Sequence, residues 1–199
     1  MPNNEPEPLH CNPVVIIGAG RSGTNMLRNI LTKFDCVSTW PCDEINYIWR
    51  HGNRDSVSDE FDEKHAREKV VKYIRGRFRQ FASNSSHWTC TRGEKYLVEK
   101  TCANSLRVNY VNRVLPEARY IYLVRDGRDV VASAIQRWKA PLDIPYLFAK
   151  ARYVPWSDLL FYGKGYFENR MEKFSNPESR LSIWGPKFKG WPEIVNKMT

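Results

Sequence analysis

The segment VVIIGAGRSGTNML, residues 14–27, places three glycines and an arginine between an apolar run and a helical pattern. The spacing Gly18-x-Gly20-x-x-Gly23 is typical of a turn that binds a dinucleotide. The pair Gly18 and Gly23, with four residues between them and a hydroxyl residue after them, is similar to the phosphate loop of nucleoside triphosphatases. Arg21 and its polar neighbours offer a third possibility, an anion site that needs no metal.

Two of these interpretations lack a partner residue. A dinucleotide site needs an acidic residue about 20 residues further on, at the end of the second strand. Residues 36–40 hold no carboxylate, and the first one after them is Asp43. A triphosphate loop needs Lys and then Ser or Thr after its last glycine, where this chain has Thr24 and Asn25. Asp126, after an apolar run, is a magnesium candidate and keeps a nucleotide kinase or NTPase as the alternative enzyme.

The third interpretation uses the residues that are present. A tight glycine turn before a helix directs backbone N–H groups and the positive end of the helix dipole at an anion. Arg21 adds a permanent cation, and Gly23 allows the backbone to approach the ligand closely. We therefore predict an anion-binding loop made by Gly20, Arg21, Ser22, Gly23, Thr24 and Asn25.

Two segments carry a family resemblance. GAGRSGTNML resembles the 5′-phosphosulfate loop of sulfotransferases that use 3′-phosphoadenosine 5′-phosphosulfate (PAPS), especially the branch with tyrosylprotein and bacterial sulfotransferases. YLVRDGRDVVAS resembles that family's 3′-phosphate motif, with Arg125 at a strand end and Ser133 eight residues later. The segments EKT at 99–101 and LPEARY at 115–120 are similar to the family's run into this strand. The resemblance implies a P-loop-like α/β sulfotransferase fold over about residues 13–138.

The resemblance also implies roles for individual residues. PAPS would be the co-substrate, its product PAP (adenosine 3′,5′-bisphosphate), and no metal would be required. Arg21 would face the bridging oxygen of the leaving phosphate, and Lys100 would neutralise the sulfonate. Glu44 would be the general base for an acceptor hydroxyl, with His51 and His65 as alternative bases.

Each of these residues also has a purely structural interpretation. Glu44 is also compatible with a surface carboxylate near a helix N-cap, and a lysine at a strand end is usually solvated. Arg125 has Asp126 and Asp129 within reach as ion-pair partners. Arg128 is expected either to pair with Asp129 or to contact the nucleotide. The sequence leaves these alternatives open.

The alternation of strand and helix patterns predicts an α/β fold, in which a parallel sheet is flanked by helices in three layers. Apolar runs predict strands at 14–17, 36–40, 96–98 and 119–124. Helical spacing predicts helices over about 24–34, 46–50, 64–81, 104–115 and 129–138.

The length of 199 residues suits one domain. We predict a flexible tail at 1–12 and a single domain over 13–199. Within that domain, 13–138 would bind the donor, and the aromatic-rich 139–199 is a candidate acceptor-binding part. The relatives usually extend further, so either WGPKFKGW at 184–191, with its two lysines (Lys187 and Lys189), closes over the donor or this chain lacks that segment.

The formal net charge of +9 calls for an anionic ligand or partner. The basic run from Lys64 to Arg79 is compatible with a solvated helix face, with attraction of an anionic acceptor, or with a non-enzymatic module that binds an anionic polymer. Nothing in the sequence resembles a base-reading motif, so nucleic acid is not expected. The acceptor is left open among sugars, peptide tyrosine, lipids and small alcohols, as is the oligomeric state. The aromatic stretch 146–167 is a candidate wall of the pocket that binds the acceptor.

The five cysteines are irregularly spaced, without a CxxC pair, which predicts reduced thiols and a cytoplasmic protein. The four histidines show no ligand spacing, so no metal site is expected. No apolar run is long enough to span a membrane. The polar N-terminus MPNNEPEPLHCNP is unlike a signal peptide.

Overall fold

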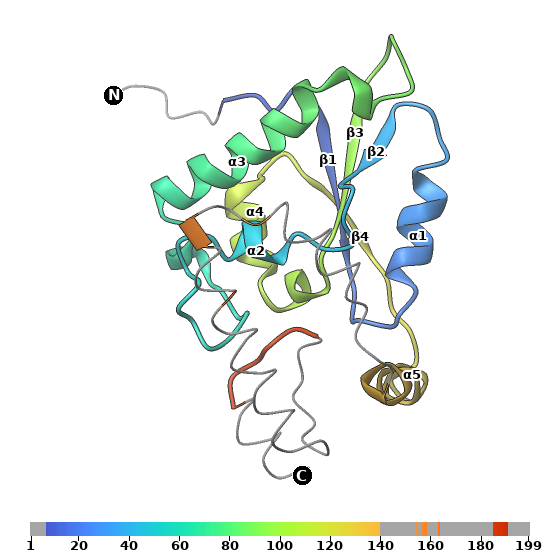
Figure 1. Cartoon of the computed structure of the whole chain (residues 1–199), viewed down its shortest axis with the longest axis vertical. Coiled ribbons are helices and arrows are strands. Elements are labelled where there is room, and N and C mark those ends of the chain that lie inside the picture. Colours follow the sequence, from blue (N-terminus) through green and yellow to red (C-terminus); the bar gives the residue numbers. More distant parts are fainter. Residues whose placement is uncertain (1–6, 140–153, 155–156, 159–162, 164–184, 191–199) are drawn as a thin grey trace.

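The computed structural model describes residues 7–139, 154, 157–158, 163 and 185–190. Its centre is a parallel sheet with the strand order β2-β3-β1-β4. The strands are β1 (Asn12–Ile17), β2 (Val37–Thr39), β3 (Tyr96–Lys100) and β4 (Arg119–Tyr122). All four predicted strands are therefore present, and the carboxyl ends of the strands lie at the lower edge of the sheet in Figure 1.

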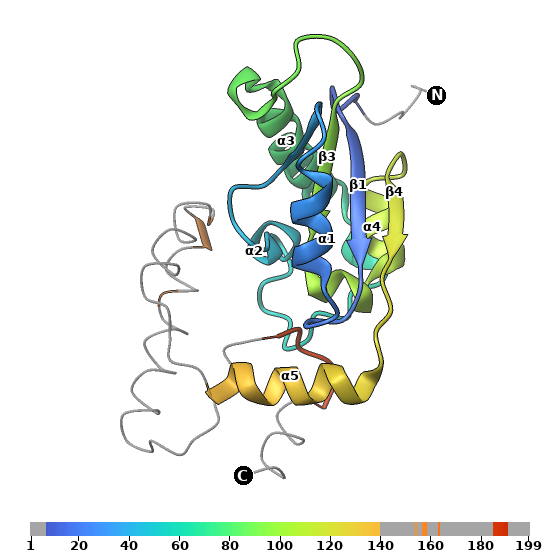
Figure 2. The same ribbon diagram turned by 90° about the vertical axis from the view of Figure 1, so that its right-hand side faces the viewer.

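Helices cover both faces of this sheet, which confirms the predicted α/β class. Helix α1 (Thr24–Leu31) lies on one face, and the helices α2 (Asn46–Trp49), α3 (Glu68–Ser83) and α4 (Val108–Val114) lie on the other (Figure 1). Helix α5 (Gly127–Lys139) runs across the carboxyl end of the sheet (Figure 2). Three short 3-10 helices complete the described chain: η1 (Glu63–His65), η2 (Ser85–His87) and η3 (Cys102–Leu106).

The core lies mainly on the face covered by α2, α3 and α4. There the rings of Trp49, Phe78 and Tyr110 are fully buried and meet edge to face, with centroids 5.8 Å and 6.2 Å from Trp49. Such pairs add to the stabilisation from burial itself. On the other face, the apolar stripe of α1 is largely at the surface of the described residues, with Met26 66% and Ile30 47% exposed.

The predicted helix over 104–115 is two helices, η3 and α4, that meet at Arg107. Arg107 leaves helical geometry (φ −149°, ψ 39°) and its guanidinium is buried. It donates hydrogen bonds to Asn104 Oδ1 (2.9 Å) and Asn46 Oδ1 (2.6 Å) and lies 3.6 Å from Asp59 Oδ1. A buried cation must be paired, so the position of these partners explains the break.

The basic run on α3 does not form one charged face. Arg75 is buried and makes a bidentate ion pair with Glu117 at 2.9 and 2.8 Å. Its guanidinium also donates to the carbonyl oxygen of Glu7 at 2.6 Å, and Arg79 forms an ion pair with the Glu7 carboxylate. Residue Leu9, in the segment predicted as a tail, is buried beside them. These arginines hold the fold together, which weakens the interpretation of an anionic-polymer-binding helix.

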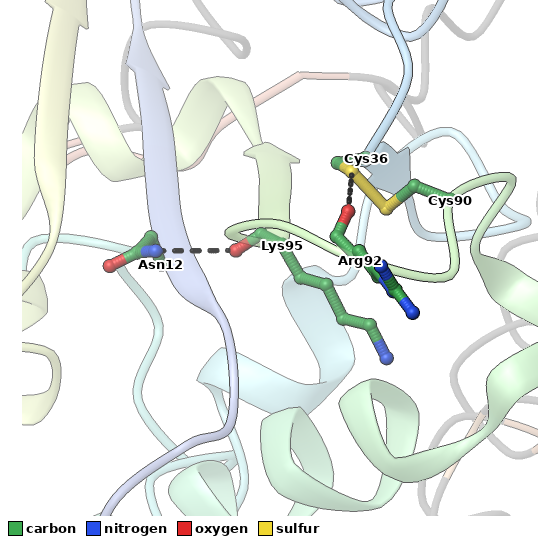
Figure 3. Close-up of a disulfide and its surroundings, with 5 residues drawn as sticks. All are labelled: Asn12, Cys36, Cys90, Arg92 and Lys95. Carbon is green, nitrogen blue, oxygen red and sulfur yellow. Dashed lines mark hydrogen bonds between the residues drawn. A yellow bond between two sulfur atoms is a disulfide. The ribbon is translucent and has the colours of Figure 1, made fainter.

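A disulfide joins Cys36, just before β2, to Cys90, in the loop that leads to β3 (Figure 3). The prediction of reduced thiols is therefore wrong for these two residues, while Cys11 and Cys102 are free thiols. Irregular spacing could not reveal the pair, because β2 and β3 become neighbours only in the folded sheet. Since the cytoplasmic prediction rested on reduced thiols, the disulfide removes its basis.

Replacing both Cys36 and Cys90 by Ser is expected to lower the free energy of unfolding by about 2–5 kcal/mol, because the bridge closes a long loop. For a chain of this size, that corresponds to a melting temperature lower by roughly 5–15 °C. Scanning fluorimetry with and without dithiothreitol measures the shift. Reductant should destabilise the parent protein and leave the double variant unchanged; equal responses of the two proteins would contradict a stabilising bridge.

No helix within the described ranges has the length and apolar character needed to cross a membrane.

Candidate functional site

The predicted site residues gather where the parallel strands end. Strand β1 lies between β3 and β4. The connection after β1 leads to β2 on one side of the sheet, and the connection after β3 leads to β4 on the other side, so the chain changes direction at the carboxyl ends of β1 and β3. In open α/β sheets this is the usual place of a ligand site. The loop from Gly18 to Gly23 leaves β1 here and leads into α1, and α5 crosses the same edge (Figure 2).

Two glycines give the loop its shape. A Cβ atom on Gly18 would lie 2.8 Å from the carbonyl oxygen of Leu123, so only glycine lets the loop pass this close to the chain after β4. Gly23, the N-cap of α1, has φ 93°, in the left-handed region that favours glycine. Within the described residues no side chain caps α1, which leaves its first N–H groups to face an anion.

Arg21, Arg125 and Ser133 meet on one side of this loop. The Nε atom of Arg21 donates to Ser133 Oγ at 3.0 Å, and Nη1 of Arg125 donates to the carbonyl oxygen of Arg21 at 3.1 Å. The two arginines thus converge from segments more than 100 residues apart in the chain. Arg125 also lies 3.6 Å from Asp129, so the structural interpretation of this residue holds beside the functional one.

On the other side of the loop, Lys100 faces two carboxylates. Its Nζ donates to Glu44 Oε1 at 3.0 Å and to Asp43 Oδ1 at 3.3 Å. The Lys100 side chain is 2% exposed and that of Glu44 is 26% exposed, so the pair opens toward solvent on the glutamate side. Burial alone would lower the pKa of Lys100, but the negative charges of the Glu44 and Asp43 carboxylates outweigh it, and the net effect is a raised pKa. The ammonium is therefore charged at neutral pH.

Backbone and side-chain contacts hold Glu44 in place. The N–H of Cys102 donates to Glu44 Oε1 at 3.3 Å, the same oxygen that Lys100 contacts. The next residue, Ile45, donates its N–H to Thr101 Oγ1 at 3.2 Å. The partners of Glu44 and Ile45, namely Cys102 and Thr101, directly follow β3, so this strand positions the base candidate relative to the lysine.

Arg28 of α1 fixes the neighbouring carboxylate. Its Nη1 donates to Asp43 Oδ1 at 2.9 Å and to the Asp43 carbonyl oxygen at 3.2 Å. Burial would raise the pKa of Asp43, but Lys100 and Arg28 lower it below its ordinary value. Asp43 is thus an anion between two cations. Our sequence analysis missed Arg28, although an arginine within an apolar helical pattern is the signal that would have suggested a buried partner.

Cys102 connects the two halves of the site. Its sulfur lies 3.9 Å from Thr24 Oγ1 at the start of α1, while its N–H contacts Glu44. Burial, together with the charge of Glu44, raises the pKa of the Cys102 thiol to about 12. The thiol is therefore neutral at physiological pH and unsuited to nucleophilic attack. It contributes a packed, uncharged contact between the loop and the acid–lysine cluster.

The alternative residues lie elsewhere. The Arg128 side chain donates two hydrogen bonds to Asp126, at 3.2 and 2.8 Å. Its ion-pair partner is therefore Asp126 and not Asp129, the partner that the sequence suggested. His65 contacts Asp62 Oδ1 at 2.8 Å in the cap of η1.

His51 lies 3.1 Å from Asp158 Oδ2 and stacks on Tyr73. The backbone of Lys187 pairs with Asp59, at 2.6 and 2.8 Å, in the loop that precedes η1. Most of the stretch 146–167, the predicted acceptor wall, lies outside the described residues. The structure thus brings together the predicted donor residues and Glu44 with Lys100, and it gives both alternative bases other partners.

A sequence model of the sulfotransferase family matches residues 13–146 of the chain. The chain belongs to the sulfotransferase family. The matched span contains the loop after β1, the acid–lysine cluster and the Arg125–Ser133 segment. No curated protein matches the chain significantly.

Membership of the sulfotransferase family makes the protein a transferase of sulfuryl groups. Among the described residues, no cluster of three or more His, Cys, Asp or Glu side chains could hold a metal ion. The positive charge at this edge of the sheet comes from Arg21, Arg125, Lys100 and Arg28, of which the last two pair with carboxylates.

Proposed function

We propose that this sulfotransferase transfers a sulfuryl group from PAPS to a hydroxyl of its acceptor. The observation that carries the proposal is the convergence of Arg21, Arg125 and Ser133 beside an uncapped helix N-terminus. A donor with phosphate groups at two positions requires two separate anion sites. The loop before α1 would form one of these sites, and Arg125 with Ser133, both in contact with Arg21, would form the other.

The loop would hold the 5′-phosphosulfate. Backbone N–H groups at the start of α1 would donate to the anion there, and Arg21 would add its guanidinium cation. Its Nε is engaged by Ser133, which fixes the guanidinium while its other N–H groups remain for the phosphate. Arg125 and Ser133 would bind the 3′-phosphate through charge-assisted hydrogen bonds.

The acid–lysine cluster would carry out the transfer. The acceptor oxygen forms a bond to sulfur while the bond between sulfur and the bridging phosphate oxygen breaks, and Glu44 takes the hydroxyl proton. Sulfuryl transfer resembles phosphoryl transfer, in which positioning and electrostatic stabilisation do most of the catalysis. Lys100, held between two carboxylates, would place its positive charge against the sulfonate oxygens.

Calorimetric titration with PAP tests the donor site. We expect metal-independent binding that 5′-AMP does not match, because 5′-AMP lacks the 3′-phosphate. Arg125→Ala should weaken PAP binding by about 10- to 150-fold, the effect of losing a hydrogen bond to a charged group, worth roughly 1.5–3 kcal/mol. The affinity for 5′-AMP should change little in the same variant.

Arg113→Ala is the matched control, since Arg113 is exposed on α4. This variant should bind PAP like the parent protein. Equal affinity for PAP and 5′-AMP would contradict the proposed 3′-phosphate site, and binding of ATP that requires Mg²⁺ would favour the kinase alternative.

The acceptor and the compartment belong to the proposal as well. The net charge of +9 favours acceptors that carry negative charge, whether peptide, carbohydrate or small molecule. The Cys36–Cys90 disulfide favours an oxidising compartment over the cytoplasm that the sequence predicted.

A further inference from the structure

Residues 84–86, at the end of α3, read Asn-Ser-Ser. This is the pattern N-x-S/T, with a middle residue other than proline, that accepts N-linked glycans. It occurs once among the 199 residues. The catalytic and donor-binding residues described above do not include it, so the proposed function leaves it unexplained.

The local structure presents this asparagine to solvent. Residues 83–86 are exposed, and Asn84 is the one residue between the end of α3 and the start of η2. Asn84 Oδ1 accepts hydrogen bonds from the N–H of Ser86 (3.1 Å) and from its hydroxyl (2.8 Å). This Asx turn directs the amide of Asn84 away from the backbone. Its Nδ2 lies within hydrogen-bond distance of one further side-chain atom, His87 Nε2, at 3.4 Å, and this contact is itself at the surface.

The disulfide is an independent observation that points to the same modification. Cys90 lies in the loop that follows Asn84, and its bridge to Cys36 needs an oxidising environment to persist. N-linked glycans are added in an environment of that kind, on surface loops of proteins that enter the secretory pathway. The exposed N-glycan acceptor sequence and the disulfide lie in one surface segment, and both require an oxidising compartment of the secretory pathway.

We propose that Asn84 is N-glycosylated. In the reaction, Nδ2 forms a bond to C1 of an oligosaccharide carried by a lipid diphosphate. The bond between C1 and the diphosphate oxygen breaks, the lipid diphosphate leaves with the bonding electrons, and Nδ2 loses one proton. The oligosaccharide donor and the transferase come from the secretory compartment of the cell.

A glycan at this position does not obstruct the donor site. The segment from Asn84 to Lys95 precedes β3, so it lies at the amino end of the strands, at the top of the sheet in Figure 1. Lys100 and the loop after β1 lie at the opposite, carboxyl end. The glycosylated and unglycosylated proteins are therefore expected to bind PAP equally.

The test is expression of the full chain behind a cleavable secretion leader in a eukaryotic host, followed by peptide N-glycosidase treatment. The parent protein should lose the mass of one oligosaccharide, and peptide mapping should find Asn84 converted to Asp. Ser86→Ala should abolish the glycan while leaving Asn84 in place, and Ser86→Thr should retain it. Ser83→Ala, an exposed neighbour outside the acceptor pattern, is the matched control and should remain glycosylated.

A folded, secreted parent protein that carries the Cys36–Cys90 bridge and no glycan would overturn the proposal. So would a glycan that persists in Ser86→Ala. Neither result depends on donor binding. The calorimetric titration with PAP tests the proposed sulfuryl transfer separately, so a failure of one proposal is distinguished from a failure of the other.

Discussion

Replacing Glu44 by Gln is expected to lower the rate of sulfuryl transfer by about 10²- to 10⁴-fold, the usual contribution of a general base. The amide keeps the shape of the side chain and its contacts at Oε1 with Lys100 and the N–H of Cys102, but it cannot take a proton. The variant should therefore fold and bind PAP normally. The measurement is the rate of PAP formation from PAPS with a panel of phenol, tyrosine-peptide and polysaccharide acceptors.

Asp43→Asn distinguishes the two neighbouring carboxylates. Asp43 is held by Arg28 and Lys100, an arrangement that suits a positioning residue, so its variant should lose less than about tenfold. Glu63→Gln, an exposed carboxylate on η1, should leave the rate unchanged. If Asp43→Asn were the more damaging of the two active-site changes, the role of base would move from Glu44 to Asp43.

Replacing Lys100 by Met is expected to lower the same rate by about 10²- to 10³-fold, as removal of one electrostatic contact to a transition state does elsewhere. The methionine fills a similar volume at the end of β3 without the charge. Glu44 would then lose its ion pair with Lys100 while Asp43 would keep Arg28, and the unbalanced negative charge should also reduce stability. Lys100→Arg restores the charge with a planar, longer head group and should recover only part of the rate.

The exposed Lys33 provides the matched control, since Lys33→Met removes the same charge far from any carboxylate pair. Melting curves of all three variants separate loss of activity from loss of folding. A Lys100→Met protein with full activity would exclude contact between this ammonium and the sulfonate. Unchanged PAP affinity together with a slow rate would place its effect in the transfer step.

The sequence predicted the order of the elements and most of the site because these depend on local patterns. Four apolar runs became the four strands, and the glycine loop lies between strand and helix as expected. The convergence of Arg21 with Arg125 and Ser133 followed from the resemblance and the geometry of parallel strands, whose carboxyl ends meet at one edge.

Features that depend on distant contacts were not predictable in the same way. The Cys36–Cys90 bridge forms because the starts of β2 and β3 are adjacent in the sheet, which spacing along the chain does not reveal. The burial of Arg75 depends on Glu117 and on the carbonyl oxygen of Glu7, both distant in sequence. Helical periodicity alone therefore counted Arg75 as a surface cation.

The last two residues of β3, Glu99 and Lys100, are an acidic and a basic residue that face opposite sides of the sheet. Lys100 turns toward the carboxylates of the donor edge, while Glu99 is fully buried and accepts hydrogen bonds from Trp49 (3.1 Å) and Asn104 (2.8 Å). Because neighbouring residues of a strand face opposite sides, inserting or deleting one residue upstream in β3 would exchange the two. An anion would then face the sulfonate and an ammonium would enter the core. Natural variation in the length of this chain is therefore expected in its loops, while β3 keeps its register to the residue.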